Sequence, residues 1–337
     1  MKTAVIGAGR MGRRHVQVVR ELGLELVGLC DAKPDSLEAA AREERLSSAS
    51  LYTDVARLLE ERRPECVVVA TTAPSHADFT CRAAEAGARF VLCEKPMAIS
   101  LAECDRMRGV CRDRGTRLAI NHQMRFMEQY TAPKALLDSE AFGGLRSVVV
   151  AAGNFGMAMN GTHYFEMFRF MTGEPPATVA AWFSPGAVPN PRGAQFEDRA
   201  GSVRMETASG KRFYMDVTDD QGHGVKVTYS ARHGQITVDE LAGVMVVDVR
   251  QAEHRPLPTT RYGMPSARTE RRIRPADAVA PTRAVLEALL RGSGYPSGED
   301  GRLAVAALVA AYVSNETGHT PVAIGDALPA VRVFPWA

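Results

Sequence analysis

The fold of this chain is decided by its first twelve residues, in which Thr3-Ala4-Val5-Ile6 is followed directly by Gly7-Ala8-Gly9-Arg10-Met11-Gly12. The first four form a short run typical of a strand, and a helical pattern begins within the glycine motif. In such a unit Gly7 permits a tight turn, Gly9 lets backbone N–H groups approach a pyrophosphate, and Gly12 lets helix and strand pack closely. The stretch therefore predicts a strand, a glycine turn and a helix whose N-terminus faces phosphates.

Strands and helices alternate through the rest of the first 121 residues. Continuous apolar runs such as Cys66–Ala70 are typical of parallel strands that are buried on both faces. The expected strands are Thr3–Ile6, Glu25–Cys30, Cys66–Ala70, Arg89–Cys93 and Arg117–Asn121, and the expected helices are Met11–Leu22, Pro34–Arg45, Asp54–Arg62, His76–Ala86 and Ser100–Arg114. This order predicts an α/β fold, a doubly wound parallel Rossmann sheet, in residues 1–122.

The pattern changes after residue 122, where strand-like runs follow one another through short turns such as Ala208-Ser209-Gly210-Lys211. Short connections between successive strands require antiparallel pairing. The runs are Arg146–Asn154, Val179–Ser184, Gly201–Thr207, Arg212–Thr218, Val225–Ala231, Gln235–Asp239 and Val244–Arg250, with helices at Thr162–Met171, Pro281–Leu290 and Glu299–Glu316. We therefore expect residues 123–337 to form an α+β domain for substrate binding and oligomerisation, with a mostly antiparallel open sheet of six or seven strands. We allow for its C-terminal helix and tail to pack back on the first domain, and we expect Arg255–Arg274 to be a long loop.

Length and composition narrow the class of protein. A chain of 337 residues favours two domains, and 41 Lys+Arg against 39 Asp+Glu argues against a nucleic-acid partner. No apolar run reaches the roughly 18 residues that span a bilayer, and the N-terminus does not read as a signal peptide. The six cysteines form no C-x-x-C pair. We therefore expect a cytoplasmic protein with no membrane partner, with reduced and mostly buried thiols and no metal site.

An acidic residue, Asp31, follows the second expected strand, 24 residues after Gly7. A carboxylate at this place accepts hydrogen bonds from an adenosine ribose and repels a 2′-phosphate. Lys33 weakens that preference, because it can offset the carboxylate. The alternative is a solvated aspartate beside a glycine-rich turn. We expect NAD rather than NADP as cofactor.

A lysine follows the expected strand Arg89–Cys93, in Glu94-Lys95-Pro96. Ligands of open α/β sheets bind beyond the carboxyl ends of the strands, so Lys95 should point toward the cofactor. The proline restricts Lys95 to extended geometry and raises the chance of a cis bond. A lysine beside a positive nicotinamide should have a depressed pKa, which suits proton exchange with a substrate hydroxyl. The alternative is a surface lysine in a turn.

Taken together, several segments resemble the glucose–fructose oxidoreductase/inositol dehydrogenase/MocA family. They are Gly7–Gly12 with Asp31, Thr71-Thr72-Ala73-Pro74-Ser75-His76, Glu94-Lys95-Pro96, Asn121–Phe126, Gly161-Thr162-His163 and Ser297–Gly301. The resemblance covers essentially the whole chain, and the Glu-Lys-Pro motif with the distal histidine is its more specific part. It implies an NAD-dependent dehydrogenase that acts on a CH–OH group, the secondary hydroxyl of a sugar, a polyol or a nucleotide-activated sugar.

The resemblance also implies that the alcohol proton goes to a histidine–lysine pair, for which His163 and Lys95 are the matching residues. The alternative for His163 is a capping or core histidine. Glu166 stands where the family usually has aspartate, a conservative change. Met159 replaces the aspartate that the family commonly has four residues before the histidine, and it cannot orient an imidazole or accept a proton. This departure keeps two alternatives open, a cofactor-binding sensor without turnover and an NAD-dependent glycosidase with transient oxidation.

The expected site residues fall into two groups. The cofactor-binding group is Gly7, Gly9, Arg10, Met11, Gly12, Asp31, Thr71, Thr72, Pro74, His76, Glu94 and Lys95. The substrate-binding group is Lys95, Arg125, Asn160, His163 and Tyr164, with Tyr130 and Asn154 as further candidates.

Two further features of the second domain bear on partners. The arginines at 255, 261, 268, 271, 272 and 274 either form a solvated face or include one or two that grip the diphosphate of a nucleotide-sugar. The runs Val148–Val150 and Val244–Val247 are too apolar to leave in water. We therefore expect this sheet to pack against another subunit, in a homodimer or a homotetramer.

Overall fold

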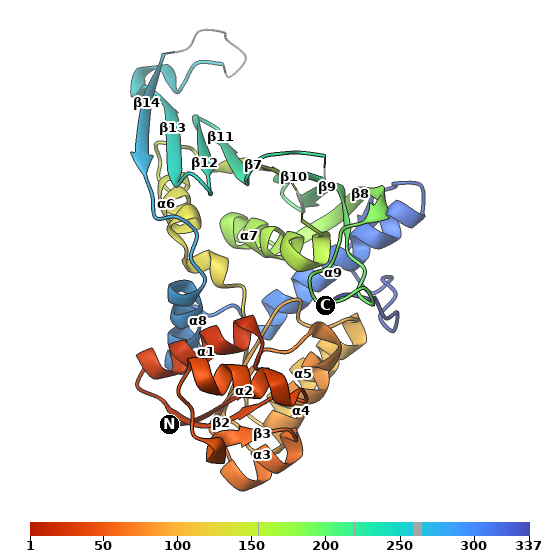
Figure 1. The fold of residues 1–337 in the computed structure, drawn as a ribbon. Helices are drawn as coiled ribbons and strands as arrows, with labels where there is room; N and C mark the ends of the chain where they lie inside the picture. The colour runs from red at the N-terminus through yellow and green to blue at the C-terminus, as the bar shows by residue number, and fades with distance from the viewer. Residues whose placement is uncertain (154, 219, 259–264) are drawn as a thin grey trace. The chain divides into compact units, whose positions relative to one another are not determined.

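The computed structural model describes residues 1–153, 155–218, 220–258 and 265–337, and it divides into two compact units (Figure 1). The first unit comprises Met1–Gln123, Asp277–Val305 and Pro329–Ala337. The second comprises Met124–Ala276 and Ala306–Leu328. The chain therefore leaves the first unit at residue 123 and returns to it twice.

The first unit is built on a six-stranded parallel sheet in the order β3-β2-β1-β4-β5-β6. Its strands are β1 (Lys2–Ile6), β2 (Glu25–Cys30), β3 (Leu51–Tyr52), β4 (Cys66–Val69), β5 (Phe90–Cys93) and β6 (Arg117–Ile120). This order is that of a Rossmann fold, so the predicted fold of the first domain is confirmed. Strands β4 and β5 are buried along their whole length, which explains why their sequences are continuous apolar runs.

Helices connect these strands. They are α1 (Arg10–Glu21), α2 (Pro34–Glu43), α3 (Val55–Arg62), α4 (His76–Glu85) and α5 (Leu101–Asp113), joined by α8 (Val279–Arg291) from the returning chain. Local sequence sets their starts. Pro34 occupies the first turn of α2, Asp54 caps α3 by accepting from the N–H of Arg57, and Ser100 caps α5 by accepting from that of Glu103. All six cysteines are free and buried, as predicted.

The second unit is built on a nine-stranded sheet within the described residues, in the order β14-β13-β12-β11-β7-β10-β9-β8-β15. Its strands are β7 (Leu145–Gly153), β8 (Pro176–Ala187), β9 (Arg199–Thr207), β10 (Arg212–Thr218), β11 (Lys226–Ala231), β12 (Gly234–Asp239), β13 (Val244–Arg250), β14 (Ser266–Arg272) and β15 (Val322–Ala323). The described strands pair antiparallel except β7 and β10, which are parallel. The mostly antiparallel sheet is therefore confirmed, and it is larger than expected.

Two helices and a π-helical turn belong to this unit, α6 (Glu128–Leu137), α7 (Thr162–Thr172) and η4 (Met157–Gly161). Figure 1 shows α7 along one face of the sheet, where Phe165 contacts Phe213 of β10 with ring centroids 6.1 Å apart. The long helix α9 (Gly298–Glu316) begins in the first unit and ends in the second.

The prediction of a loop over Arg255–Arg274 is wrong for Ser266–Arg272. This segment is the edge strand β14, and it pairs residue for residue with β13. All seven of its residues are exposed, so the segment shows no alternation of apolar and polar side chains from which a strand could be predicted. Arg268 and Arg272 are bound locally, to the Asp248 carboxylate at 3.1 Å and to the Ala242 carbonyl at 3.1 Å. Arg261 lies outside the described residues.

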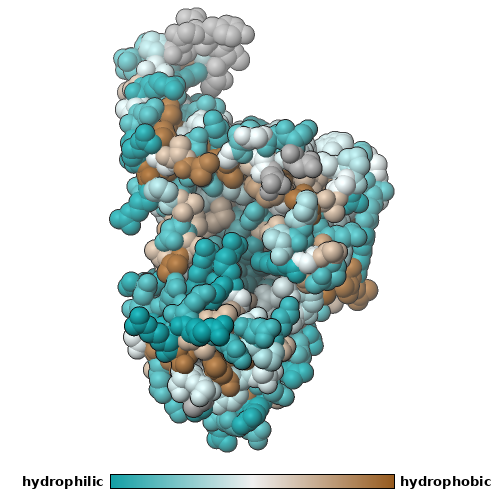
Figure 2. All heavy atoms as spheres, viewed as in Figure 1, coloured by the Kyte–Doolittle hydropathy of each residue, from teal (hydrophilic) through white to brown (hydrophobic). Residues whose placement is uncertain are grey.

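The apolar runs of the sheet are divided between its two faces. Val148 and Val150 are fully buried, whereas Val149 between them is 41% exposed. Met245 is likewise buried on the covered face. Strand alternation therefore divides each run, with part of its side chains in the core and part on the other face of the sheet. On the face of the molecule in Figure 2, hydrophilic residues predominate and hydrophobic ones form small separate patches.

Candidate functional site

The glycine turn after β1 has the geometry that the motif predicts. Gly7 has φ +105°, and a Cβ on it would lie 2.5 Å from the carbonyl oxygen of Ala70. A Cβ on Gly12 would lie 1.8 Å from the carbonyl oxygen of Gly7. Both positions therefore require glycine. Gly9 differs, because a Cβ there would meet nothing within 4 Å, so the backbone of the turn borders open space.

Helix α1 begins at this open space. Gly9 is its N-cap, no side chain caps its first turn, and that turn contains no acidic residue. The first N–H groups of a helix and its partial positive charge together form an anion-binding end. The turn and the helix can therefore accommodate a pyrophosphate, with Arg10 and Met11 in the first turn.

Asp31 is held against the same turn. One oxygen of its carboxylate accepts the N–H of Ala8 at 2.8 Å, and the other accepts the N–H of Lys33 at 2.9 Å. The carboxylate is thus fixed at the carboxyl end of β2, beside the glycine turn. This is the place from which it could reach a ribose.

The turn after β4 is joined to the turn after β5. The ring nitrogens of His76 lie 2.9 Å from the carbonyl oxygen of Pro96 and 3.2 Å from that of Thr71. The Ser75 hydroxyl donates to the Thr71 hydroxyl at 2.7 Å, in the same turn as Thr72 and Pro74. The Lys95–Pro96 bond is cis. His76 therefore acts as a brace between two loops of the expected cofactor edge.

Glu94 is buried behind that edge. Its Oε1 accepts from the Nε2 of His15 at 2.8 Å and from the Nδ2 of Asn121 at 2.8 Å. Burial alone would raise the pKa of Glu94, but the hydrogen bond from His15, the charges of His15 and Lys95, and the hydrogen bond from Asn121 lower it to about 2. Glu94 is therefore a carboxylate at neutral pH. Lys95 is also largely buried.

The strand register brings these loops to one edge of the sheet. Ile6 is aligned with Cys30 of β2 and with Val69 of β4, Val69 with Cys93 of β5, and Cys93 with Ile120 of β6. The residues that follow, among them Gly7, Asp31, Thr71, Glu94 and Asn121, lie at the carboxyl ends of the strands. Since neighbouring strands are about 4.8 Å apart, the glycine turn and Lys95 are separated by about 10 Å, with β4 between them.

In the second unit, His163 is the second residue of α7 and is buried. The turn η4 before it is held by Asp198, whose two carboxylate oxygens accept the N–H groups of Ala158 and Met159, each at 2.8 Å. Asp198 is 1% exposed, and a Cβ on Gly156 would lie 2.1 Å from its Cγ. The carboxylate of Asp198 thus binds the backbone N–H of position 159, where the side chain is methionine. Sequence reasoning missed Asp198, because a lone aspartate before a strand belongs to no motif.

Arg125 is part of a buried ion pair in the second unit. Its guanidinium contacts the Glu166 carboxylate, which also binds Arg169 at 3.1 Å, and it lies over the ring of Phe170 at 5.1 Å. Arg125 and Glu166 therefore hold each other. Of the other expected substrate-binding residues, Asn160 is half-buried in η4, and Asn154 lies outside the described residues.

Tyr164 and Tyr130 both turn their hydroxyls toward Glu240. Tyr130 donates to Oε1 at 2.5 Å and Tyr164 to Oε2 at 3.2 Å. Burial raises the pKa of Glu240 to about 7, although the two hydrogen bonds oppose the shift. The structure therefore places these tyrosines in a buried carboxyl cluster.

This cluster predicts a pH-dependent stability. The pKa of Glu240 is higher in the folded protein than in the unfolded chain, so its contribution is fully present below pH 4.5 and is lost as the pH rises through 7. The glutamine of Glu240→Gln cannot ionise. As the pH rises through this window, the free energy of unfolding of the variant should therefore increase relative to that of the wild type by up to about 3 kcal/mol. Urea unfolding at a series of pH values measures the difference. Glu253→Gln, at an exposed carboxyl, is the control, and curves that run parallel for Glu240→Gln and wild type would refute the prediction.

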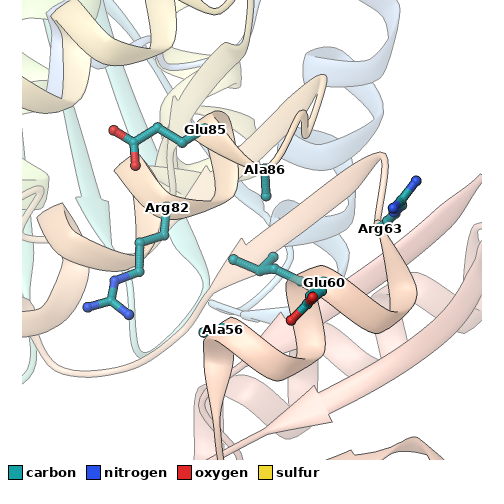
Figure 3. A pocket seen from close by; sticks show the side chains of 7 residues that line it. Ala56, Glu60, Arg63, Arg82, Glu85 and Ala86 are labelled. Atoms are coloured by element: carbon teal, nitrogen blue, oxygen red, sulfur yellow. The ribbon is translucent and has the colours of Figure 1, made fainter.

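One hollow of the first unit lies outside the expected site. Figure 3 shows an open depression between α3 and α4, bordered by charged side chains of both signs, Glu60, Arg63, Arg82 and Glu85. It contains none of the expected site residues.

No group of three or more His, Cys, Asp or Glu residues that could hold a metal ion occurs in the part of the chain that the structure describes. Nor does any described helix have the length and apolarity to cross a membrane.

Comparison with known proteins gives matches for both units. Residues 1–122 match the GFO_IDH_MocA family model, described as an oxidoreductase family with an NAD-binding Rossmann fold. D-Apiose dehydrogenase of Paraburkholderia graminis is 32% identical over 197 residues, which are 53% of this chain and 52% of that protein. Inositol 2-dehydrogenase of Pseudomonas fluorescens is 29% identical over 233 residues, 64% of this chain and 67% of that protein. The chain thus matches about half of the length of the first relative.

Solved structures share the fold over nearly the whole chain. An oxidoreductase from Agrobacterium radiobacter, solved in complex with NAD+, L-tartaric acid and magnesium, has a TM-score of 0.81 at 20% identity. The match covers 97% of this chain and 99% of that one. At this identity the likeness shows the fold of the two units alone.

Proposed function

By its residues 1–122 this chain belongs to the GFO_IDH_MocA oxidoreductase family, and we propose that the whole protein is an NAD-dependent dehydrogenase of a sugar or polyol secondary hydroxyl. One observation carries the proposal: the strand register brings the glycine turn, Asp31 and Lys95 to the same edge of a Rossmann sheet. Two of the matching relatives are named D-apiose dehydrogenase and inositol 2-dehydrogenase, which supports a polyhydroxylated substrate.

The residues of the first unit fit the cofactor. The backbone of Gly7–Gly12 would hold the pyrophosphate, because Gly9 leaves open space and α1 has no capping side chain. Asp31 would accept from the adenosine ribose. The turns with Thr71, Thr72, Pro74, His76, Glu94 and Lys95 would border the rest of the molecule along the strand ends. When bound, NAD+ supplies the acceptor for the hydride.

The chain itself would handle the proton. We assign to Lys95 and His163 the removal of the hydroxyl proton from the alcohol, and its return in the reverse direction. Asn160 would bind substrate hydroxyls, together with Arg125 and Tyr164, whose polar groups already have partners in the protein. Asp198 would fix the η4 turn that carries Asn160 and leads into His163. With methionine at position 159 the site lacks a side-chain carboxylate there, but the backbone N–H of Met159 is still bound by Asp198.

The experiment is NADH formation by the purified protein against a panel of free sugars, polyols, sugar acids and nucleotide-sugars. Turnover of a free sugar or polyol is the expected result. Turnover confined to nucleotide-sugars would favour a role for arginines such as Arg271 and Arg272, both exposed on β14. Tight NADH binding without turnover of any substrate in the panel would refute the proposed activity.

Asp31 should set the preference for NAD over NADP. Asp31→Ala removes an acceptor for the ribose hydroxyls and the charge that repels a 2′-phosphate, so we expect NADH affinity to fall about tenfold or more and NADPH affinity to rise. Fluorescence titration with both cofactors measures the ratio. Asp35→Ala, an exposed carboxylate in the first turn of α2, is the matched control and should leave the ratio unchanged. An unchanged ratio in Asp31→Ala would contradict the assignment.

We also propose that the protein is a homodimer, or a homotetramer built from dimers, through the open face of the second sheet. The register places Val149 beside Tyr214, and Trp182 lies on the same face, with all three among the exposed large side chains. Sedimentation of the wild type at micromolar concentration should show a species larger than the monomer. Tyr214→Asp should shift it toward the monomer, and a monomeric wild type would refute the proposal.

A further inference from the structure

A chain of buried polar side chains runs through the first unit behind Lys95. It starts at His15 on α1, passes through the Glu94 carboxylate after β5 and the Asn121 amide after β6, and ends at the Thr282 hydroxyl on α8. The side chains of His15, Asn121 and Thr282 are fully buried, so none of them borders solvent. A buried polar group is costly unless it has a hydrogen-bond partner. Here His15 and Asn121 both donate to the Glu94 carboxylate, and Thr282 accepts from Asn121.

The charges that face this carboxylate are few. His15 faces it from α1, and Lys95 follows it in the same loop. β6 contributes the uncharged amide of Asn121 and, through it, α8 contributes the hydroxyl of Thr282. Cys93 at the end of β5 has its pKa raised well above the ordinary value by burial and, to a smaller extent, by Glu94. His76 on α4 faces the carbonyl oxygen of Pro96.

We infer that His15 is a positioning residue for Lys95: with Asn121 it holds Oε1 of the Glu94 carboxylate, whose Oε2 accepts the backbone N–H of Lys95 at 3.3 Å, and it thereby fixes a negative charge beside the residue that carries the ammonium. The interaction between two charges is mutual, so a lysine that stabilises the ionised form of Glu94 is itself stabilised in its ammonium form. Neither His15 nor Asn121 reaches the surface, so they act on the chemistry through Glu94. The inference rests on the proposed function only for the role of Lys95.

The placement of His15 also links two parts of the expected site. His15 lies one turn after Gly12 on the helix whose N-terminus faces the phosphate space. Helix α1 therefore carries both the anion-binding N-terminus and His15, which begins the series of hydrogen bonds behind Lys95. A shift of α1 would change the phosphate site and the surroundings of Glu94 together.

The test follows the titration of Lys95 itself. The chain has only six lysines, so the ¹³C-methylated ε-amino groups give few NMR signals, and the one missing in Lys95→Arg is assigned to Lys95. Spectra are recorded from about pH 6 to about pH 11, a range that spans lysine titration. Glu94→Gln should lower the midpoint of the Lys95 titration by about one pH unit. His15→Ala should move it in the same direction by less, and His15→Gln, which keeps an N–H donor, should restore the wild-type midpoint.

The control is Glu44→Gln. Glu44 is a buried carboxylate of the same unit, paired with Arg20 at 2.9 Å, and it should leave the Lys95 midpoint unchanged. The inference is overturned if Glu94→Gln leaves the midpoint in place, if Glu44→Gln moves it equally, or if His15→Ala has no effect. Should His15→Ala fail to fold, a midpoint in His15→Gln that matches that of Glu94→Gln would overturn the role of His15, and a wild-type midpoint would support it.

NADH binding is measured on the same samples, which separates this inference from the proposed function. A shifted titration in a protein that does not bind NADH would refute the function and keep the inference. Turnover in the wild type with an unshifted titration in Glu94→Gln would do the reverse.

Discussion

Replacing Lys95 with alanine is expected to lower kcat by a factor of about 10³ while leaving NADH binding within a few-fold of the wild type. A positioned proton acceptor contributes 10²- to 10⁴-fold, and its loss acts on the chemical step rather than on the phosphate contacts of the glycine turn. Steady-state kinetics on the substrate found by the panel, together with NADH titration, measure both quantities.

Two further variants sharpen that result. Lys95→Arg keeps a positive charge that cannot be given up near neutral pH, so it should be nearly as inactive as the alanine variant if the proton transfer matters. Lys2→Ala removes an exposed lysine of the same unit and should behave as the wild type. Activity of Lys95→Ala within tenfold of the wild type would show that another group takes the proton.

The second large effect concerns two glycines of one turn, whose variants should fail in different ways. Gly12→Ala places a Cβ 1.8 Å from the carbonyl oxygen of Gly7, so backbone must move, and we expect a loss of about 3 kcal/mol or more of stability. Gly9→Ala places its Cβ in open space, so the free energy of unfolding should be unchanged. Because that space is where we place the pyrophosphate, Gly9→Ala should weaken NADH binding about 100-fold, or about 2.7 kcal/mol.

Thermal unfolding and NADH titration on both variants decide the matter. Normal NADH binding by Gly9→Ala would mean that the phosphates lie elsewhere. A wild-type melting temperature for Gly12→Ala would mean that the close contact between α1 and the turn is not essential to the fold.

Much of the first unit could be predicted because its physical constraints are local. A parallel strand buried on both faces must be apolar throughout, and β4 and β5 are. The glycines at 7 and 12 are required by contacts with backbone atoms, which leaves a fixed spacing in the sequence. By contrast, β3 has two residues and β14 is a polar edge strand, so neither contains a period that could be recognised.

The partners of the site residues could not be predicted, because they are distant from those residues in the sequence. Glu94 is part of a recognisable motif, but His15 reaches it from a helix 79 residues away in the chain, and Thr282 reaches its other partner, Asn121, from 161 residues away. Asp198 anchors η4 from a loop 39 residues beyond Met159. These contacts depend on tertiary packing, and a single buried side chain belongs to no sequence motif from which its partner could be predicted.

The return of the chain to the first unit has a consequence for synthesis on the ribosome. The N–H of Ala102 at the start of α5 donates to the carbonyl of Ala330, the N–H of Phe334 donates to that of Ile99, and Trp336 is fully buried. The core of the first unit is therefore completed only after residues 329–337 have been synthesised. A nascent chain of 122 residues exposes the surfaces that α8 and the tail later cover, and those surfaces are where a chaperone or a protease would meet it first.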